Sequence, residues 1–310
     1  MQLLDRVPSF NFMGRRRGAA VLSAILIVGC LAAIVARGLN FGIDFTGGVL
    51  VEVSYDGEAD LAKIRAALTD DGFDKAQVQN FGTSRDVLVR LPPADDTQTG
   101  AQVSDQLIGT LSSADSSAKI RRVEFVGPQV GEELTEQGGL ALLFALILIF
   151  AYVVLRFQWR YAVGAIVALV HDVVFTVGTF AIFQWPFDLS VLAAVLAVIG
   201  YSLNDTIVAF DRIRENFLGL RSGSPEEIMN LSVNQMLART LITGITTLLV
   251  LTALYFLGGE AVNTFSIALI VGILVGTYSS IYVAAAVALV LGASRMDLLP
   301  PRPDEVDDMP

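Results

Sequence analysis

Six long apolar runs constrain this chain more than any other feature of its sequence. They lie at about 19–36, 138–155, 161–183, 189–210, 238–257 and 263–291. A helix needs roughly 18 or more apolar residues to cross the hydrocarbon core of a bilayer. With 54% hydrophobic and 17% charged residues, the chain is also too apolar for a soluble domain. The sequence therefore predicts an α-helical polytopic membrane protein with six transmembrane helices.

The longest polar stretch, residues 37–137, has the size of one domain. Val49, Val51 and Val53 alternate with small or polar residues, which is the pattern of a strand with one buried face. Further strand and helix patterns follow along the stretch. The expected strands are 46–55, 76–81, 86–91 and 118–126, and the expected helices are 58–71 and 98–113. The order βαββαβ predicts a ferredoxin-like α+β sandwich of two helices on a four-stranded sheet.

These patterns divide the chain into four parts. We expect an N-terminus with the first transmembrane helix at 1–36, a ferredoxin-like domain at 37–137, five transmembrane helices at 138–292 and an acidic tail at 293–310. A basic start followed by an apolar run is also typical of a cleaved signal peptide. The first run is long for such a peptide, and no clean small-residue cleavage site precedes Arg37. We therefore expect an uncleaved helix.

The segments between the apolar runs differ in their arginine content. Lysine and arginine are enriched in cytoplasmic loops of membrane proteins. The turns 184–188 and 258–262 contain no arginine, whereas the other turns and both ends of the chain do. The arginines concerned are Arg15, Arg16, Arg17, Arg156, Arg160, Arg212, Arg214, Arg221, Arg295 and Arg302. We therefore expect both termini in the cytoplasm and residues 37–137 in the periplasm.

Two polar residues that are costly inside a bilayer, Asn204 and Asp205, lie within the fourth apolar run. A charged side chain at the centre of a membrane helix costs ~2.5–3.5 kcal/mol on insertion scales, so it usually faces a partner or a water-filled path. One interpretation is a carboxylate at the membrane interface, near the helix end. The interpretation that we favour is a proton-binding or gating site at Asp205.

Arg239 lies where the fifth run begins, on a helix antiparallel to the fourth. Asp205 and Arg239 are each within a few helical turns of the cytoplasmic side, so they can meet at a similar depth. The alternative for Arg239 is an ordinary positive-inside anchor whose side chain reaches the interface.

His171 and Asp172 lie near the middle of the third run. Neighbouring residues of a helix point in different directions, so at most one of the two is expected to face the same path as Asp205. For His171 we expect a hydrogen-bonded interior imidazole rather than a proton relay. For Asp172 the sequence leaves an ion-coupling role and structural pairing equally open.

Several classes of function are excluded by the sequence. It contains no GxxxxGK[ST] phosphate loop, so the protein draws on an ion gradient, on a partner or on no energy source at all. The single histidine and single cysteine, Cys30, provide no zinc site, and no nucleophile stands beside an oriented base. We therefore expect no metal, no cofactor and no enzymatic activity. Acidic residues outnumber basic ones 17 to 9 in 37–137, which argues against nucleic-acid binding.

Glycine pairs mark two further places. Gly47 and Gly48 precede the first strand of the polar block, where they allow a tight or left-handed backbone. Gly272 and Gly276 form a GxxxG pattern in the last run. This pattern permits close contact between membrane helices, although it also occurs by chance in apolar segments.

Four segments of the chain together resemble the SecF family of the bacterial protein-export machinery. They are FGIDFTGG at 41–48, VGPQVGEEL at 126–134, VIGYSLNDTIVAFDRIREN at 198–216 and NQMLARTLITGITT at 234–247. The resemblance implies roles in proton transport for the aspartate of the third segment, Asp205, and the arginine of the fourth, Arg239. This chain reads LART where the family reads LSRT, which leaves the arginine in place.

The first two segments contain the residues for which we expect structural roles. These residues are Asp44, Gly47, Gly48, Pro128 and Gly131.

The resemblance also implies partners and an activity. SecF is similar to one half of an RND transporter, and it forms a pseudo-symmetric twelve-helix unit with its partner SecD in the lipid of the inner membrane. This unit associates with the SecYEG channel and YajC. It uses the proton motive force to pull or release the translocating polypeptide after ATP-driven SecA has pushed it through. The sequence does not separate proton from sodium coupling, because a buried carboxylate serves either ion.

Two other functions compete with this interpretation. A half-size RND-type exporter of small molecules is the first, but it would normally have a larger periplasmic region than 100 residues. A passive scaffold for translocon assembly is the second. A scaffold has no need for costly groups such as Asp172, Asp205 and Arg239 inside the bilayer. We therefore favour an auxiliary, gradient-driven protein translocase subunit.

Overall fold

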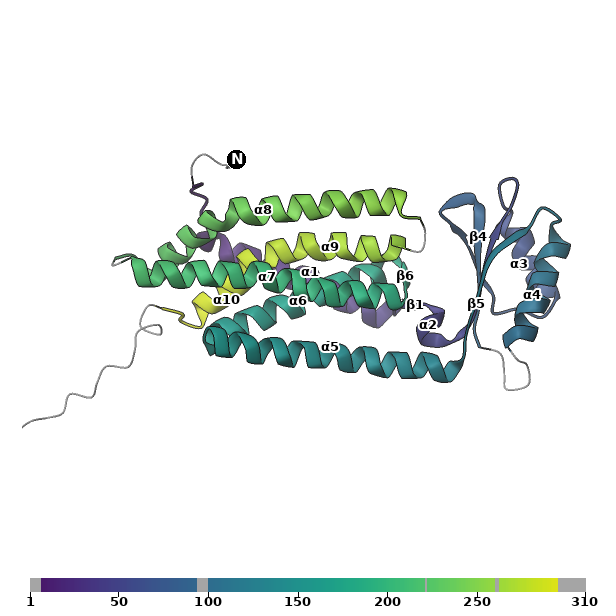
Figure 1. Ribbon diagram of the computed structural model, residues 1–310, viewed down its shortest axis with the longest axis horizontal. Coiled ribbons are helices and arrows are strands. Elements are labelled where there is room, and N and C mark those ends of the chain that lie inside the picture. Colours follow the sequence, from purple (N-terminus) through teal and green to yellow (C-terminus); the bar gives the residue numbers. More distant parts are fainter. Residues whose placement is uncertain (1–6, 94–99, 221, 260–261, 295–310) are drawn as a thin grey trace, which may run out of the picture.

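The computed structural model describes residues 7–93, 100–220, 222–259 and 262–294. It consists of a long helical bundle with a small α/β domain at one end (Figure 1). The acidic tail from 295 onward lies outside the described residues. Three arginines used above to orient the chain, Arg221, Arg295 and Arg302, lie outside them as well.

Six helices are long and apolar enough to cross a membrane, which confirms the number of spans expected from the sequence. They are α1 (Arg16–Arg37, preceded by the 3-10 turn η1, Met13–Arg15), α5 (Pro128–Arg156), α6 (Trp159–Phe183), α7 (Leu189–Gly219), α8 (Pro225–Leu257) and α9 (Asn263–Ser279). The last continues through the π-helical segment η3 (Ser280–Ala284) into α10 (Ala285–Val290).

Two of these helices begin about ten residues before their apolar runs. Helix α5 begins at Pro128 rather than near 138, and α8 begins at Pro225 rather than near 238. Hydropathy marks only the part of a helix that lies in lipid, whereas its end is set by local capping. Pro128 occupies the first turn of α5, where a missing N–H is tolerated. Ser224 and Glu227 form a reciprocal capping box at the start of α8.

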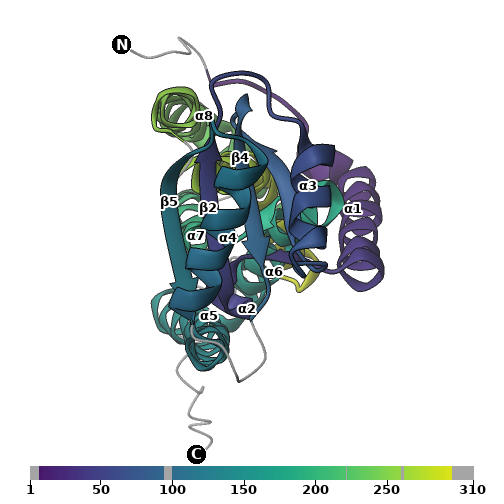
Figure 2. The same cartoon turned by 90° about the vertical axis from the view of Figure 1, so that its right-hand side faces the viewer.

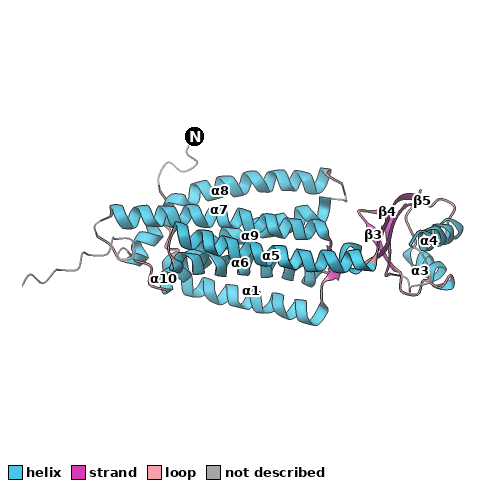
Figure 3. Cartoon of the chain, turned by 60° about the horizontal axis from the view of Figure 1, so that its bottom comes forward, coloured by secondary structure: helices cyan, strands magenta, loops and turns pink. Residues whose placement is uncertain are grey.

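Helices α6, α7 and α9 form the centre of the bundle, and α1, α5 and α8 lie more peripherally (Figure 3). The GxxxG glycines of α9 pack directly on α7. A Cβ atom on Gly272 would come within 2.1 Å of Val198 Cγ2, and one on Gly276 within 3.1 Å of Ser202 Cβ. The expected close helix contact is therefore confirmed, and its partner is α7.

All six elements expected in the polar block are present in the expected order. They are β2 (Gly48–Ser54), α3 (Leu61–Asp70), β3 (Gln77–Phe81), β4 (Thr83–Leu91), α4 (Gly100–Ala114) and β5 (Lys119–Val126). The sheet is antiparallel with the order β3-β4-β2-β5, which is the arrangement of a split βαβ ferredoxin-like fold.

One face of this sheet is covered by α3 and α4, and the other faces the helical bundle (Figures 1 and 2). The alternating valines Val49, Val51 and Val53 are at most 2% exposed and pack in one core with Leu68 and Leu107. The alternation in the sequence thus marks the face of β2 that lies under the two helices.

Candidate functional site

Asp172 lies at the meeting point of the three central helices. Its side chain on α6 is fully buried. Its Oδ2 atom accepts hydrogen bonds from Ser202 Oγ of α7 at 2.6 Å and from Ser279 Oγ of α9 at 2.7 Å. Buried polar groups with well-matched partners fix the arrangement of the elements that carry them. Asp172 therefore ties α6, α7 and α9 together in the middle of the bundle.

His171 extends this polar centre toward α1. Its Nδ1 atom lies 3.0 Å from Asp172 Oδ1, and its ring packs against Phe175 and Tyr278. The Tyr278 hydroxyl donates a hydrogen bond to the carbonyl of Ala19 and lies 3.0 Å from Ser23 Oγ, both on α1. The imidazole is thus an interior group with a polar partner, as expected, although its Nε2 atom is buried without a hydrogen bond from the described residues.

Asp205 lies on α7, one helical turn after Ser202. The residue is 6% exposed, and its Oδ2 atom receives no hydrogen bond from the described part of the chain. Orphaned buried carboxylate oxygens are rare because each carries a desolvation cost. In contrast to Asp172, Asp205 thus has a carboxylate oxygen that is buried without a hydrogen bond from the described residues.

Arg239 lies at the same depth as Asp205 on the neighbouring helix. Asp205 lies 14 residues before the end of α7 at Gly219, and Arg239 lies 14 residues after the start of α8 at Pro225. At ~1.5 Å per residue, each is about 21 Å from the connection between the two helices. The arginine acts electrostatically on the Asp205 carboxylate, while no ion pair within 4 Å joins these two described residues.

Three side chains of this region were not singled out from the sequence: Ser202, Ser279 and Tyr201. The two serines supply the hydrogen bonds to Asp172. The Tyr201 hydroxyl is buried without a hydrogen-bond partner among the described residues, on the same helix as Asp205. The signal for Ser202 was its position three residues before Asp205, which places it on the same helical face.

The five residues with expected structural roles meet where the α/β domain joins the bundle. The short helix α2 (Ile43–Thr46) lies between them. Asp44 Oδ2 accepts a hydrogen bond from the Leu189 N–H at the start of α7. The side chain of Asp188 caps the same helix through the Val191 N–H. Carboxylates at a helix N-terminus satisfy its free N–H groups and its dipole, so Asp44 fastens the domain to α7.

Gly47 and Gly48 hold a backbone that other residues rarely adopt, with φ angles of +71° and +119°. A Cβ atom on Gly48 would lie 2.1 Å from the Leu91 carbonyl oxygen. One on Gly131 would lie 2.9 Å from Gly47 N, and one on Gly47 would lie 3.0 Å from Pro128 Cα. The left-handed entry into the sheet is confirmed, and the two motif segments form one tightly packed joint.

A two-stranded pairing completes the joint. Strand β1 (Asn40–Phe41) pairs in parallel with β6 (Pro186–Phe187), which directly precedes α7.

Within the described ranges, no group of three or more His, Cys, Asp or Glu side chains is placed to hold a metal ion.

The fold and its polar centre define a class: a multi-pass membrane protein with ionisable side chains in the middle of its helix bundle and an α/β domain at one end. Two family descriptions match the sequence. They are "SecD/SecF GG Motif" over residues 32–59 and "Protein export membrane protein SecD/SecF, C-terminal" over residues 106–294. The chain belongs to the SecF family of protein translocase subunits.

Relatives cover almost the whole chain. The protein translocase subunit SecF of Vibrio alginolyticus is 50% identical over 100% of this chain and 99% of its own length. The subunit of Pseudomonas aeruginosa is 51% identical, with 98% and 99% covered. The resemblance found in the four sequence segments is thus confirmed.

A crystal structure of SecDF, a translocon-associated membrane protein from Thermus thermophilus, is similar with a TM-score of 0.84 and 38% identity. The match covers 94% of this chain and 39% of the solved SecDF chain. SecDF in a super-membrane-facing form matches the same share at the same identity, with a TM-score of 0.70.

Proposed function

We propose that this protein is the SecF half of a SecD–SecF unit in the bacterial inner membrane. It uses the proton motive force to complete polypeptide export. The observation that carries this proposal is the buried Asp205 carboxylate, whose Oδ2 atom has no hydrogen-bond partner among the described residues, beside Arg239 at equal depth. A charge that crosses the membrane field gains ~2.3 kcal/mol per 100 mV, and a protonatable carboxylate at membrane depth can collect this energy.

Protonation of Asp205 would change the force between α7 and α8. The ionised carboxylate attracts the Arg239 guanidinium, and the protonated one does not. Asp172, which holds α7 to α6 and α9 through Ser202 and Ser279, acts as a positioning residue of the same ion-coupling unit. Asn204 lies beside Asp205 and belongs to the exposed side of this unit.

Helix α7 offers a direct connection from this site to the α/β domain. It is one continuous helix of 31 residues, with Asp205 in its second half and the Asp44 contact at its first residue. A shift of α7 at Asp205 would therefore also move the contact between α7 and the α/β domain. The difference in TM-score between two SecDF forms, 0.84 and 0.70, supports a family in which the parts change their arrangement.

The outward faces of α7 and α8 fit a protein partner better than lipid. Asn204 and Arg239 are exposed in this chain, although both lie in the middle of long apolar helices. Polar side chains that face lipid at this depth are costly, so they usually face protein or water. We assign this face to SecD, because the solved SecDF chain is far longer than this one. We also propose contacts with SecYEG and YajC, for which the resemblance to the family is the only support.

The proposed orientation places both termini in the cytoplasm and the α/β domain in the periplasm. Thiol labelling of single cysteines, in a Cys30→Ser background, tests it. We expect membrane-impermeant reagents to reach residue 84 from the periplasmic side and residue 158 from the cytoplasmic side. Ser84 is an exposed position of β4, and residue 158 lies in the turn between α5 and α6. Labelling of residue 158 from the periplasm would reverse the proposed membrane topology. It would also contradict the placement of Asp205 and Arg239 relative to the cytoplasmic side.

Protein export by membrane vesicles that contain this subunit and its partner tests the proposed energy source. With ATP-driven translocation held constant, we expect a proton ionophore to remove the stimulation that depends on this subunit. An ionophore that collapses only a sodium gradient should leave the stimulation intact. The reverse pattern would replace proton by sodium coupling. Stimulation that survives both treatments would favour the passive scaffold.

A further inference from the structure

A groove on the side of the bundle away from Asp205 has the features of a lipid site. We propose that it binds one anionic phospholipid of the cytoplasmic leaflet, with the headgroup phosphate at Arg17 and an acyl chain along the groove. The assignment to the cytoplasmic leaflet rests on the orientation proposed above. None of the residues assigned to ion coupling lines this groove, although His171 at its inner end contacts Asp172.

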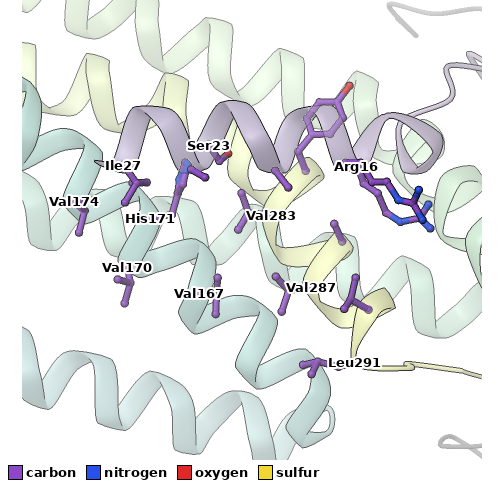
Figure 4. Close-up of a pocket in the computed structure, with 16 residues that line it drawn as sticks. Arg16, Ser23, Ile27, Val167, Val170, His171, Val174, Val283, Val287 and Leu291 are labelled. Carbon is purple, nitrogen blue, oxygen red and sulfur yellow. The ribbon is translucent and has the colours of Figure 1, made fainter. Parts of the chain in front are cut away.

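The groove has a volume of about 630 Å³ and is lined by α1, α6, η3 and α10 (Figure 4). Apart from Arg16 and Arg17 at one end and His171 at the other, its walls are mostly apolar, with Ile27, Val167 and Leu291 among them. Figure 4 shows Arg16 and His171 near opposite ends of the row of apolar side chains. An apolar channel with cations at one end is complementary to an anionic amphiphile.

The length of the groove matches one leaflet. Along α1 it extends from Arg16 to Ile27, which is about 16 Å at ~1.5 Å per residue. Half of a ~30 Å hydrocarbon core is about 15 Å. His171, at its inner end, lies in the middle of α6 (Trp159–Phe183). The groove therefore runs from the level of the headgroups to the bilayer centre, which is the extent of one acyl chain.

The two arginines at the mouth of the groove have different partners. Arg16 is held in place because its Nη1 atom donates to the Met13 carbonyl at 2.7 Å and lies 2.8 Å from Glu226 Oε2. Arg17, the next residue of α1, is exposed. Basic pockets between membrane helices on the cytoplasmic side bind anionic headgroups. Arg17 therefore supplies the headgroup charge, and the fixed Arg16 lines the mouth beside it.

A second groove on the same side of the bundle differs from the first in its lining. It has a volume of about 780 Å³ and lies between α1, α6 and α9 on the other side of His171. No arginine or lysine is among its described lining residues. Both grooves offer apolar space, but only the first has arginines among its described lining residues. The Arg37 guanidinium at the other end of α1 instead donates to the carbonyl of Ile182. We therefore assign the anionic lipid to the first groove.

The test uses the full-length subunit with its partner, purified in detergent and stripped of lipid. It is titrated with phosphatidylglycerol or the neutral phosphatidylcholine, and bound lipid is counted by native mass spectrometry. We expect phosphatidylglycerol to bind more tightly. Arg17→Ala should weaken its binding about fivefold, the usual effect of one arginine near an anionic headgroup. Arg15→Ala is the matched control, because Arg15 is exposed and does not line the groove.

A second variant tests the apolar part. Ala24→Phe places a ring in the groove, at an exposed position of α1, and should lower phosphatidylglycerol binding with all charges kept. Circular dichroism and gel filtration verify that it folds. Asp205→Asn should bind lipid like the wild type. The proposal for the lipid site and the proposal for proton-driven export can therefore be tested independently of each other. Equal binding of both lipids, equal effects of Arg17→Ala and Arg15→Ala, or loss of a protein partner instead of lipid from Ala24→Phe would overturn the proposal.

Discussion

Asp205→Asn abolishes the part of protein export that depends on the proton gradient, while the subunit remains inserted and bound to its partner. This is the expected result because asparagine keeps the shape of the side chain and removes its titration. Export should fall to the level seen with the gradient collapsed. Arg239→Ala should have much the same effect, because it removes the cation that the ionised Asp205 carboxylate attracts. Vesicle export with and without an ionophore measures both.

Asp211→Asn is the matched control on the same helix. Asp211 pairs with Arg156 at 2.8 Å, and both side chains are about 40% exposed. Exposed ion pairs contribute ~0–1 kcal/mol, so this variant should export normally although it also loses one carboxylate from α7. Gradient-stimulated export at the wild-type level by well-expressed Asp205→Asn protein would end the proton-switch proposal and favour the scaffold.

Asp172→Ala has the largest expected effect on stability. The substitution leaves the Ser202 and Ser279 hydroxyls without their shared acceptor in the centre of the bundle. An unsatisfied buried hydroxyl costs ~1–3 kcal/mol. Ser279 keeps a second acceptor, the Gly276 carbonyl at 3.2 Å, so most of the loss falls on Ser202. We expect the free energy of unfolding to fall by about 1–3 kcal/mol, measured by detergent-induced unfolding of the purified protein.

Two further variants separate anchoring from ion coupling at Asp172. Asp172→Asn keeps the volume and one acceptor oxygen, so it should retain most of the stability and most of the gradient-stimulated export. Ser202→Ala removes one hydrogen bond and should cost less than Asp172→Ala. Wild-type stability of Asp172→Ala would contradict the anchoring role. Full stability of Asp172→Asn with lost gradient stimulation would move Asp172 into the proton path itself.

The sequence was sufficient for the features that depend on neighbouring residues. Apolar runs long enough to span a bilayer give six helices, because insertion depends on local hydropathy. The alternation of Val49, Val51 and Val53 gives the buried face of β2, because side chains alternate across a strand. The equal depth of Asp205 and Arg239 also follows from counting residues along two antiparallel helices.

Only the tertiary structure decided which distant groups meet. Ser202 and Ser279 are 30 and 107 residues from Asp172, and Leu189 is 145 residues from Asp44. No local pattern encodes such pairs, because they arise when helices pack against one another. Hydropathy shows that a helix spans the membrane, but it does not determine how the helix is rotated about its axis. For the same reason, the sequence left the role of Asp172 open, and its hydrogen bonds to α7 and α9 assign it to the centre of the bundle.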